Sequence, residues 1–433
     1  MISSRRAFLG ASGAALAGAR PGPNDTINLG LIGCGARARW AELPSFQKIP
    51  GVRWTAVCDV NSNHLADMRK RAGGDRIAAY KDFRGLIEDR NVDVVVVATN
   101  QHWHVLPLIA ACQAGKDVYV EKPLGNSIGE GRFAIEAARK YNRIVQIGTQ
   151  QHSQLHFQKA VEVVQSGRLG DISEVKVWDY ENQSPGPGSP PDCDPPPELD
   201  WDFYVGPAPY RRYNPNIYYK YGYDWFKLSG GGHQVAWGVH HFDIVLWAMG
   251  VRWPRAVSAM GGDYAFESNR EWPDTISAVL EFGPGPVARR GFLLQYTMRV
   301  GGRRDVRSHG QCYIGTQASM LLDRSGYYIV PEPASGKKAP ATGMYVNAEE
   351  SFATAGDDDR AFQVFIENVR QRRQPAADLT AGHHATNVGH LINVAYQAGR
   401  TIRWDGENER VAGDAEANRF VRKPYRAPWK LAV

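Results

Sequence analysis

Lys122 lies at the end of a short apolar run in the sequence KDVYVEKP. A lysine at the carboxyl edge of a buried parallel sheet is placed where doubly wound folds bind ligands, and burial there lowers its pKa. Such an amine can take the proton of a hydroxyl group while hydride leaves the same carbon for a nicotinamide ring. Lys122 is therefore a candidate catalytic base, although Glu-Lys-Pro is also a common turn after a strand.

The stretch INLGLIGCGARARW contains a candidate site for the nicotinamide cofactor. Its G-x-G-x-x-A pattern follows an apolar run and opens a helix-length segment. The first glycine permits a tight turn, the second lets the backbone approach a pyrophosphate, and the small third residue lets helix and strand pack closely. The helix N-terminus then offers free N–H groups to the phosphates. The predicted cofactor contacts here are Gly33, Gly35, Ala36, Arg37 and Ala38. The alternative is a glycine turn in a domain that binds no nucleotide.

Asp59 ends the next apolar run, AVCDV, at the spacing where an acidic residue binds the ribose hydroxyls of a dinucleotide. A carboxylate there would repel the 2′-phosphate of NADP, so the sequence predicts NAD. Arg37 and Arg39 weaken this preference, because either could approach such a phosphate.

The elements that must position these residues alternate between apolar runs and helix-length segments. Continuous apolar strands separated by helices predict a parallel sheet that is buried on both faces. We therefore expect an α/β chain in which residues 26–148 form a Rossmann, doubly wound domain. Its runs are INLGLIG, WTAVCDV, VDVVVVAT, KDVYVEKP and RIVQIG, with segments such as 62–72, 102–115 and 127–140 between them.

After residue 148 the pattern changes to strands with no helix between each pair, which predicts a C-terminal α+β domain with a large, mostly antiparallel sheet over 149–433. The expected strands are 171–180, 255–263, 275–282, 289–298 and 311–330. Helices are expected over 357–371 and 380–399. The last helix and the tail VRKPYRAPWKL could fold back on the Rossmann domain.

Two further stretches, ATNQHWHVLPLIAACQAGKDVYVEKPLGNS at 98–127 and GGGHQVAWGVHHFDIVLW at 230–247, carry a resemblance to a known family. With the glycine motif, they resemble the Gfo/Idh/MocA family of glucose–fructose oxidoreductase and inositol dehydrogenase. The resemblance implies that His240 is catalytic with Lys122, that Asp243 belongs to the substrate site, and that Pro123 is a candidate cis proline. It also implies cofactor contacts for Thr99, Asn100, His104, Glu121, Lys122 and Pro123.

The sequence departs from this family at Ala236, where an acid is expected four residues before His240. Half of the usual proton-handling pair is therefore absent. Either His240 and Lys122 act alone, or His233 or His241 takes over, or the substrate geometry differs. A metal cluster of His233, His240, His241 and Asp243 is an alternative, but residue 243 turns away from the shared helix face, so we expect no metal.

The segment 201–226 is dense in aromatic residues, which suit the C–H faces of sugar rings. A sugar or glycoside is therefore the expected substrate. The alternative is a hydrophobic arm that packs on a neighbouring subunit, and both readings suit a homo-oligomer, a dimer or a tetramer. Three basic residues of this segment either bind an acidic sugar or are solvated: Arg211, Arg212 and Lys220. The predicted substrate residues are Gln150, Tyr219, Tyr223, Trp225, His233, Trp237, His240 and Asp243.

Composition excludes several other classes. The net charge of +6 in 433 residues is too small to suggest a nucleic-acid partner. No apolar run approaches the roughly 20 residues needed to cross a bilayer, so we expect no membrane insertion. The five cysteines show no C-x-x-C pairing of the kind used by zinc or redox sites.

Residues 1–25 resemble a twin-arginine export signal and linker: Arg5 and Arg6 precede an Ala/Gly-rich stretch and a small-residue cleavage site at 17–19. We therefore expect a periplasmic protein exported with its cofactor already bound. The alternative is a tail with two chance arginines.

Because no nicotinamide pool exists outside the cytoplasm, export predicts tightly bound NAD and a redox-neutral cycle on a sugar or glycoside hydroxyl. Oxidation of one sugar with reduction of another, epimerisation, and glycosidic cleavage by transient oxidation and elimination all fit, the last as in NAD-dependent glycosidases related to this family. The rival functions are a cytoplasmic sugar or cyclitol dehydrogenase and a non-catalytic sugar-binding module.

Overall fold

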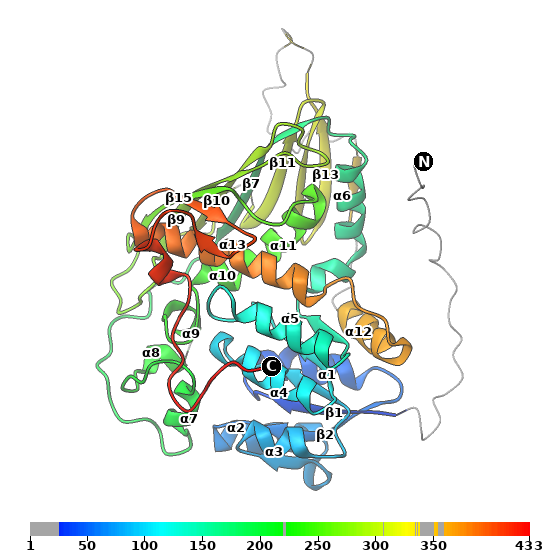
Figure 1. Cartoon of the computed structure of the whole chain (residues 1–433), viewed down its shortest axis with the longest axis vertical. Coiled ribbons are helices and arrows are strands. Elements are labelled where there is room, and N and C mark those ends of the chain that lie inside the picture. The colour runs from blue at the N-terminus through cyan, green and yellow to red at the C-terminus, as the bar shows by residue number, and fades with distance from the viewer. Residues whose placement is uncertain are drawn as a thin grey trace.

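The computed structural model describes residues 26–219, 222–305, 307–333, 335, 337, 350–353 and 359–433. The predicted export signal at 1–25 lies outside these residues, as do Lys220 and the side chain of Tyr223. Figure 1 shows the two halves of the chain one above the other, each built on its own sheet.

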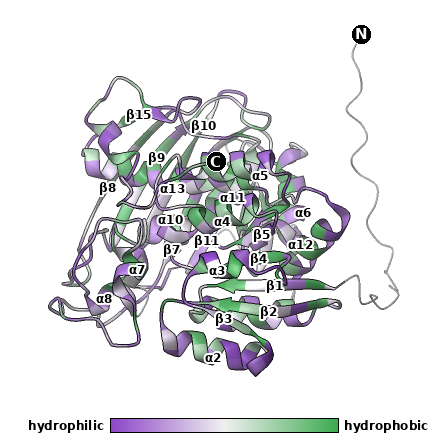
Figure 2. Cartoon of the chain, turned by 60° about the horizontal axis from the view of Figure 1, so that its bottom comes forward, coloured by the Kyte–Doolittle hydropathy of each residue, from purple (hydrophilic) through white to green (hydrophobic). Residues whose placement is uncertain are grey.

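The first half is the predicted Rossmann domain. Its six strands are all parallel and lie in the order β3-β2-β1-β4-β5-β6. The strands span Ile27–Ile32 (β1), Val52–Cys58 (β2), Ala78–Tyr80 (β3), Val94–Val97 (β4), Asp117–Val120 (β5) and Val145–Ile147 (β6). Every residue of β4 and β5 is buried because helices cover both faces of the sheet. In Figure 2 the strands β1 and β2 are hydrophobic, whereas α2 below them presents hydrophilic residues.

Three helices of this domain match the predicted segments: α2 (Ser62–Ala72), α4 (Val105–Gln113) and α5 (Glu130–Lys140). Helix α3 (Phe83–Glu88) was not predicted, and short 3₁₀ turns form at η3 (Gly74–Arg76) and η4 (Gln101–Trp103). The helix after the glycine turn is less regular. It contains a π-helical stretch, η2 (Ala38–Glu42), before α1 (Leu43–Gln47). A π turn aligns residues five apart, and Arg37 Nε donates to Glu42 Oε1 at 2.8 Å across it.

The second half is built on a ten-stranded sheet in the order β14-β13-β12-β11-β7-β10-β9-β8-β15-β16, in which only the β7–β10 pair is parallel among the described strands. Its strands span Ile172–Tyr180 (β7), Ala256–Gly262 (β8), Thr275–Phe282 (β9), Phe292–Arg299 (β10), His309–Gly315 (β11), Ala318–Asp323 (β12), Gly326–Pro331 (β13), Glu350–Phe352 (β14), Ile402–Asp405 (β15) and Arg410–Val411 (β16). Residues of β9 alternate between buried and exposed, as expected for a sheet with one packed face.

Helices cover the packed face of this sheet: η5 (Gln150–Ser153), α6 (Leu155–Gln165), α10 (His233–Ala236), α11 (Gly238–Met249), α13 (Leu379–Ala398) and η6 (Ala417–Phe420). The buried side chains of α11 and α13 belong to the same hydrophobic core as β9 and β10. Gly250, at φ +65°, ends α11 in the left-handed conformation that glycine favours.

Several segments of the second half contact the Rossmann domain, among them α13, whose Thr386 Oγ1 accepts a hydrogen bond from Leu124 N at 2.9 Å. Three more are α12, the C-terminal tail and an arm. Helix α12 (Arg360–Gln371) packs Phe362 and Phe365 against Phe46 and Tyr119. Trp429 of the tail packs at 4.8 Å, centroid to centroid, on Trp103. The third segment is residues 181–232, which we call the arm; it contains α7 (Trp201–Val205), α8 (Pro215–Tyr218) and α9 (Gly222–Trp225) and lies at the left of both domains in Figure 1.

Candidate active site

The glycine turn opens into a cavity of about 400 Å³ between the Rossmann domain and the arm. Gly33 has φ +94°, and a Cβ there would lie 2.6 Å from the carbonyl oxygen of Ala98, so only glycine fits. A Cβ at Gly35 would meet no atom within 4 Å. The second glycine therefore keeps backbone accessible to a ligand, which is the space that a pyrophosphate requires.

Asp59 also lines this cavity, held by two backbone amides. Its carboxylate accepts hydrogen bonds from Cys34 N at 2.6 Å and Asn61 N at 2.7 Å. Burial raises the pKa of Asp59, and these two bonds oppose the rise. The carboxylate thus links the glycine turn to the end of β2. The residues present fit a dinucleotide whose ribose lies beside Asp59.

Arg37 does not reach the cavity as predicted. Its guanidinium donates to Glu121 Oε1 at 2.9 Å and to Glu42 Oε1 at 2.8 Å. The Arg37 side chain is therefore held between two carboxylates under the turn, and only its backbone remains for a phosphate. Arg39, in contrast, lines the cavity.

Lys122 lies between the two halves of the chain. Its Nζ donates to the carbonyl oxygen of Ala236 at 2.8 Å. Burial lowers the pKa of Lys122, opposed by the charges of Glu121 and Asp224. The Lys122–Pro123 peptide bond is cis, which confirms the prediction for Pro123. A lysine with a lowered pKa at this sheet edge can exchange a proton with a substrate hydroxyl.

His104 does not face the cavity. Its Nδ1 lies 2.6 Å from the carbonyl oxygen of Pro123, and its Nε2 lies 3.0 Å from that of Thr99. Both ring nitrogens are thus used by backbone, so His104 joins two loops instead of contacting a cofactor. Thr99 and Asn100 do line the cavity, and the Asn100 amide donates to the Tyr204 hydroxyl of the arm.

His240 is buried near Lys122. Its Nδ1 has no hydrogen-bond partner among the described residues. Burial and the charge of Lys122 lower the pKa of His240 well below its ordinary value. His240 is therefore a neutral imidazole with a free polar atom, which suits a hydrogen bond to a substrate. Trp237 packs on it at 5.7 Å.

Four other predicted substrate residues lie elsewhere. His233 Nε2 lies 2.9 Å from Asp179 Oδ2. The His233 ring stacks on the Trp225 ring with 5.9 Å between their centroids, so each of these two side chains packs against the other. Asp243 is paired with His152 at 2.9 Å. Tyr219 lines the dinucleotide cavity beside Asp59 instead of the Lys122 end.

Gln150 begins the second domain, and its Oε1 is buried without a hydrogen-bond partner in the described part of the chain. His241 is buried, and burial lowers its pKa to about 3, which agrees with a packed histidine. No group of three or more His, Cys, Asp or Glu side chains is arranged to hold a metal ion within the residues that the structure describes.

Two models of one protein family match this chain, one near each end. Residues 27–149 match the model of the Gfo/Idh/MocA oxidoreductase family for its NAD-binding Rossmann fold, and residues 341–431 match its C-terminal alpha/beta domain. The chain belongs to the Gfo/Idh/MocA oxidoreductase family. The Rossmann domain of this family member is therefore an NAD-binding domain, as the glycine turn and Asp59 predict.

Its relatives include the myo-inositol 2-dehydrogenase of Thermotoga maritima, 30% identical over 37% of this chain and 47% of that protein. A glycosyl hydrolase family 109 protein of Saccharopolyspora erythraea is 32% identical over 37% of each chain. These alignments thus span less than half of either curated relative.

A solved structure shares the fold over most of the chain. The WlbA dehydrogenase from Bordetella pertussis, in complex with NADH and UDP-GlcNAcA, has a TM-score of 0.65 and 18% identity, covering 88% of this chain and 99% of that one.

Sequence reasoning missed Gln101 and Asp224. Gln101 Nε2 donates to Asp224 Oδ1 at 2.8 Å, although the two residues are 123 positions apart. Asp224 lies in the arm among aromatic residues that had suggested only sugar stacking. A carboxylate within a run of buried aromatics was the available signal.

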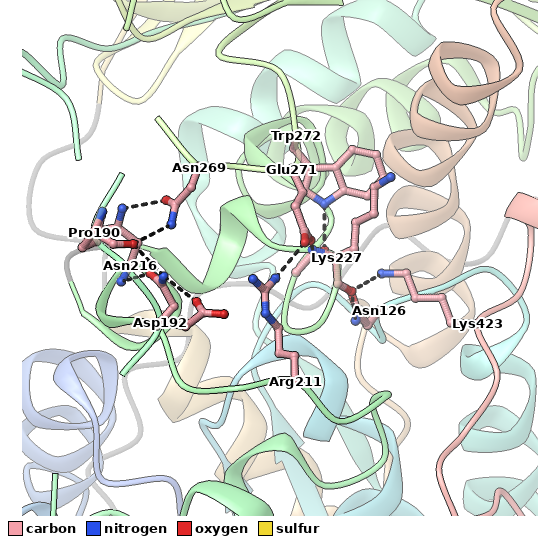
Figure 3. A network of polar contacts seen from close by, with 12 residues as sticks. Asn126, Pro190, Asp192, Arg211, Asn216, Lys227, Asn269, Glu271, Trp272 and Lys423 are labelled. Atoms are coloured by element: carbon pink, nitrogen blue, oxygen red, sulfur yellow. Dashed lines mark hydrogen bonds and ion pairs between the residues drawn. The ribbon is translucent and has the colours of Figure 1, made fainter. Parts of the chain in front are cut away.

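A second cavity, of about 590 Å³, lies between the arm, α13 and the tail. Figure 3 shows that two of its basic side chains are bound by neighbours: Arg211 pairs with Glu271 at 2.7 Å, and Lys423 donates to Asn126 at 2.9 Å. The sequence left Arg211 as either a residue that binds an acidic sugar or a solvated one, and the structure places it in an ion pair at the wall of this second cavity. It is part of the framework that holds the arm.

Described helices include none long and apolar enough to span a bilayer.

Proposed function

We propose that this protein is an NAD-dependent oxidoreductase that acts on a hydroxyl group of a sugar or glycoside. The observation that carries the proposal is the position of Lys122, half-buried at the carboxyl edge of the NAD-binding sheet with its Nζ turned toward α10. The names of the curated relatives, an inositol dehydrogenase and a glycosyl hydrolase family protein, support polyol or sugar substrates.

Each side chain near Lys122 has a separate role in the proposed reaction. Neutral Lys122 takes the hydroxyl proton, and His240 offers its free Nδ1 as a hydrogen-bond partner that fixes the hydroxyl. The carboxylate of Glu121, itself paired with Arg37, opposes the lowering of the pKa of Lys122 by burial. When bound, the nicotinamide supplies the hydride acceptor. Thr99 and Asn100 line the same cavity as Asp59.

We further propose that NAD stays bound through a redox-neutral cycle. The arm supplies one wall of the cavity, with Tyr204, Tyr218 and Tyr219, and it is fastened to the Rossmann domain by the bond from Asn61 Nδ2 to the Tyr218 hydroxyl at 2.8 Å. Because this wall would have to move before the nucleotide could leave, we expect bound NAD to exchange slowly with free NAD. Glycosidic cleavage by transient oxidation and elimination is a second candidate, supported by the glycosyl hydrolase relative.

Export to the periplasm and assembly into a homo-oligomer also remain proposals. The twin arginines at 5 and 6 support export. The open face of the large sheet carries the apolar residues Val279 and Leu293, each more than 40% exposed, which supports burial against a second copy.

The decisive experiment is mass spectrometry of the nucleotide that remains after gentle purification, followed by hydride exchange between bound cofactor and sugars labelled at carbon-bound hydrogen. We expect bound NAD and exchange without added nucleotide. Protein that purifies empty and turns over only with added NAD would point to an ordinary dehydrogenase. Bound NAD with no exchange on any sugar would instead leave a sugar-binding module.

A further inference from the structure

The second cavity, of about 590 Å³, lies apart from the residues assigned to NAD and to catalysis. Its wall comes from the arm, α13 and the C-terminal tail, together with the loop at 126–128. Asn126 ties this loop to the arm, because its Nδ2 donates to the carbonyl oxygens of Leu228 at 2.9 Å and Lys227 at 3.2 Å. Apart from Arg211, none of the described residues that line the cavity was a candidate for catalysis or for binding cofactor or substrate. The cavity has the volume of a small-molecule site.

Positive charge is in excess around this cavity. Within the described part of the chain, the carboxylates that line it are those of Asp192 and Glu271. The cationic side chains that line it are Arg211, Lys227, Arg419, Arg422 and Lys423. Glu271 is already used, because it accepts from Arg211 Nη1 at 2.7 Å and from Lys227 N at 2.7 Å. Asp192 accepts from Asn214 Nδ2 at 2.8 Å. A concave surface with such an excess of one charge attracts a ligand of the opposite charge.

Three of these cations have no partner of opposite charge. The side chains of Lys227, Arg419 and Arg422 are exposed and make no hydrogen bond or ion pair with any other described residue. The Lys227 ammonium is held by an aromatic ring instead, with its Nζ 5.2 Å from the centroid of Trp272. That indole is itself fixed, because its Nε1 donates to the carbonyl oxygen of Gly230 at 3.0 Å. These unpaired cations are available to an anionic ligand.

Lys423 is a half-buried cation of the same cavity. Its Nζ donates to Asn126 Oδ1 at 2.9 Å (Figure 3) and to the carbonyl oxygen of Lys227 at 2.8 Å. An ammonium group has three donors, so one N–H remains for a ligand. Burial lowers the pKa of Lys423 to about 8; the charges of Glu130 and Glu271 oppose this change, and that of Lys227 adds to it. An acidic group bound beside Lys423 would stabilise its ammonium form.

The cavity also offers groups that suit the neutral part of a sugar. Tyr210 is 58% exposed and presents an aromatic ring that suits the C–H face of a sugar. Gln397 of α13 donates through Nε2 to the carbonyl oxygen of Asn393 at 3.2 Å, which orients its amide and leaves Oε1 to accept from a hydroxyl group. A small inorganic anion would use neither group and would fill little of the volume.

We infer that the second cavity is a binding site for a sugar that carries an acidic group, either a carboxylate or a phosphate. The acidic group pairs with Lys423 and with the unpaired cations Lys227 and Arg422, and the sugar ring packs on Tyr210. Binding here transfers no hydride, so the inference goes beyond the proposed function and does not depend on it. Because the ligand contacts the arm and the tail at once, it also holds these two segments together.

Calorimetric titration of the full chain, as purified with its nucleotide, tests this site with four probes. Glucuronate carries a carboxylate, glucose 6-phosphate carries a phosphate, glucose carries neither, and inorganic phosphate lacks the sugar. We expect at least one of the two acidic sugars to bind about 10-fold or more tightly than both glucose and inorganic phosphate. Whichever acidic sugar binds identifies the acidic group.

A double variant, Lys227→Gln with Arg422→Gln, removes two exposed charges that have no partner, so the fold should persist. We expect it to weaken binding of the acidic sugar by about 10-fold. The matched control is Arg403→Gln with Lys430→Gln, which removes the same two kinds of charge from exposed positions outside the cavity. This control should keep the wild-type affinity.

Lys122→Met separates the second cavity from the catalytic site. The acidic sugar should bind Lys122→Met as tightly as it binds the wild type. An affinity that falls in Lys122→Met but persists in the double variant would place the ligand at the Lys122 end and overturn the inference. Failure of both acidic sugars to bind, or binding of glucose or inorganic phosphate as tightly as the acidic sugars, would overturn it as well.

The outcomes also separate this inference from the proposed function. Binding that the double variant loses, in a protein that exchanges no hydride with any sugar, would support the second site and remove the proposed function. Hydride exchange in a protein that binds neither acidic sugar at the second cavity would remove the site and leave the function standing.

Discussion

Gly33 and Gly35 are two positions apart, but an added side chain should affect stability at the first and NAD binding at the second. Alanine at Gly33 must adopt φ +94° and lie 2.6 Å from the Ala98 carbonyl oxygen, so Gly33→Ala should destabilise the fold by about 1–3 kcal/mol. The Cβ of a valine at Gly35 meets no protein atom within 4 Å, and the side chain occupies the space expected for the pyrophosphate. We expect Gly35→Val to lower NAD affinity at least about 10-fold with little change in the free energy of unfolding. Calorimetry with NAD and urea denaturation measure the two effects, and equal effects of both variants would contradict the assignment of the cavity.

Lys122 allows a second test at a single residue. Replacement by Met keeps the length of the side chain and removes the amine, so hydride exchange should fall by about 10²- to 10⁴-fold. NAD should remain bound, because the cavity residues near Asp59 are untouched. Stopped-flow or isotope-exchange rates measure the loss, and a variant that exchanges hydride at the wild-type rate would exclude Lys122 as the base.

At this scale the sequence predicts residue types better than directions. Sequence motifs fix backbone positions, and the residues that they place in or near the site are Gly33, Gly35, Asp59, Lys122 and His240. Arg37, His104 and Asp243 were expected to contact ligands, but each side chain is bonded to another part of the chain. Tyr219 lines the cavity that holds Asp59. Side-chain directions depend on such tertiary partners, which spacing along one chain does not reveal.

The register of the π turn after the glycine motif decides which side chains face one another. It aligns Arg37 with Glu42 and lets the same guanidinium hold Glu121, whose pKa the Arg37 charge lowers against burial. Arg37→Met leaves two buried carboxyl groups without a cation. Because Arg37 is itself 39% exposed, we expect a loss of about 1–3 kcal/mol, at the lower end of the cost of breaking a buried pair.

The matched control for this variant is Arg39→Met. Arg39 is 3.8 Å from the partly exposed Asp67, so its loss should change the free energy of unfolding by less than about 1 kcal/mol. Urea denaturation of the two variants separates them. Equal stability of both would show that Glu121 does not need Arg37.

The five expected runs of the Rossmann half all form strands, because continuous apolar segments are stable as parallel strands covered by helices on both faces. The short strand β3 and helix α3 were not expected, because neither contains a long apolar run. The expected run at 311–330 contains three strands, β11, β12 and β13, separated by tight turns. The arm is the part that periodicity could not predict, because its short helices are fixed by contacts such as those of Asn100 with Tyr204 and Asn61 with Tyr218.

For the molecule as a whole, the buried charges set a pH dependence of stability. The pKa of Asp224 rises from an ordinary 3.8 to about 6 in the folded protein. The folded state therefore binds this proton more tightly than the unfolded state, and the stabilising contribution present below about pH 4 is lost as pH rises to about 6. The full change corresponds to about 3 kcal/mol.

Asp224→Asn should remove this loss. Relative to wild type, the variant should be more stable at pH 7.5 than at pH 4.5, measured by urea denaturation at the two pH values. The same difference at both values would show that Asp224 does not carry the predicted protonation.

The arm closes one side of the nucleotide cavity and is anchored to both halves of the chain. With NAD held through the proposed redox-neutral cycle, the dinucleotide would enter before the arm is fastened by Asn61 and Asn100. Filling the site would then be a step of maturation and not of each turnover.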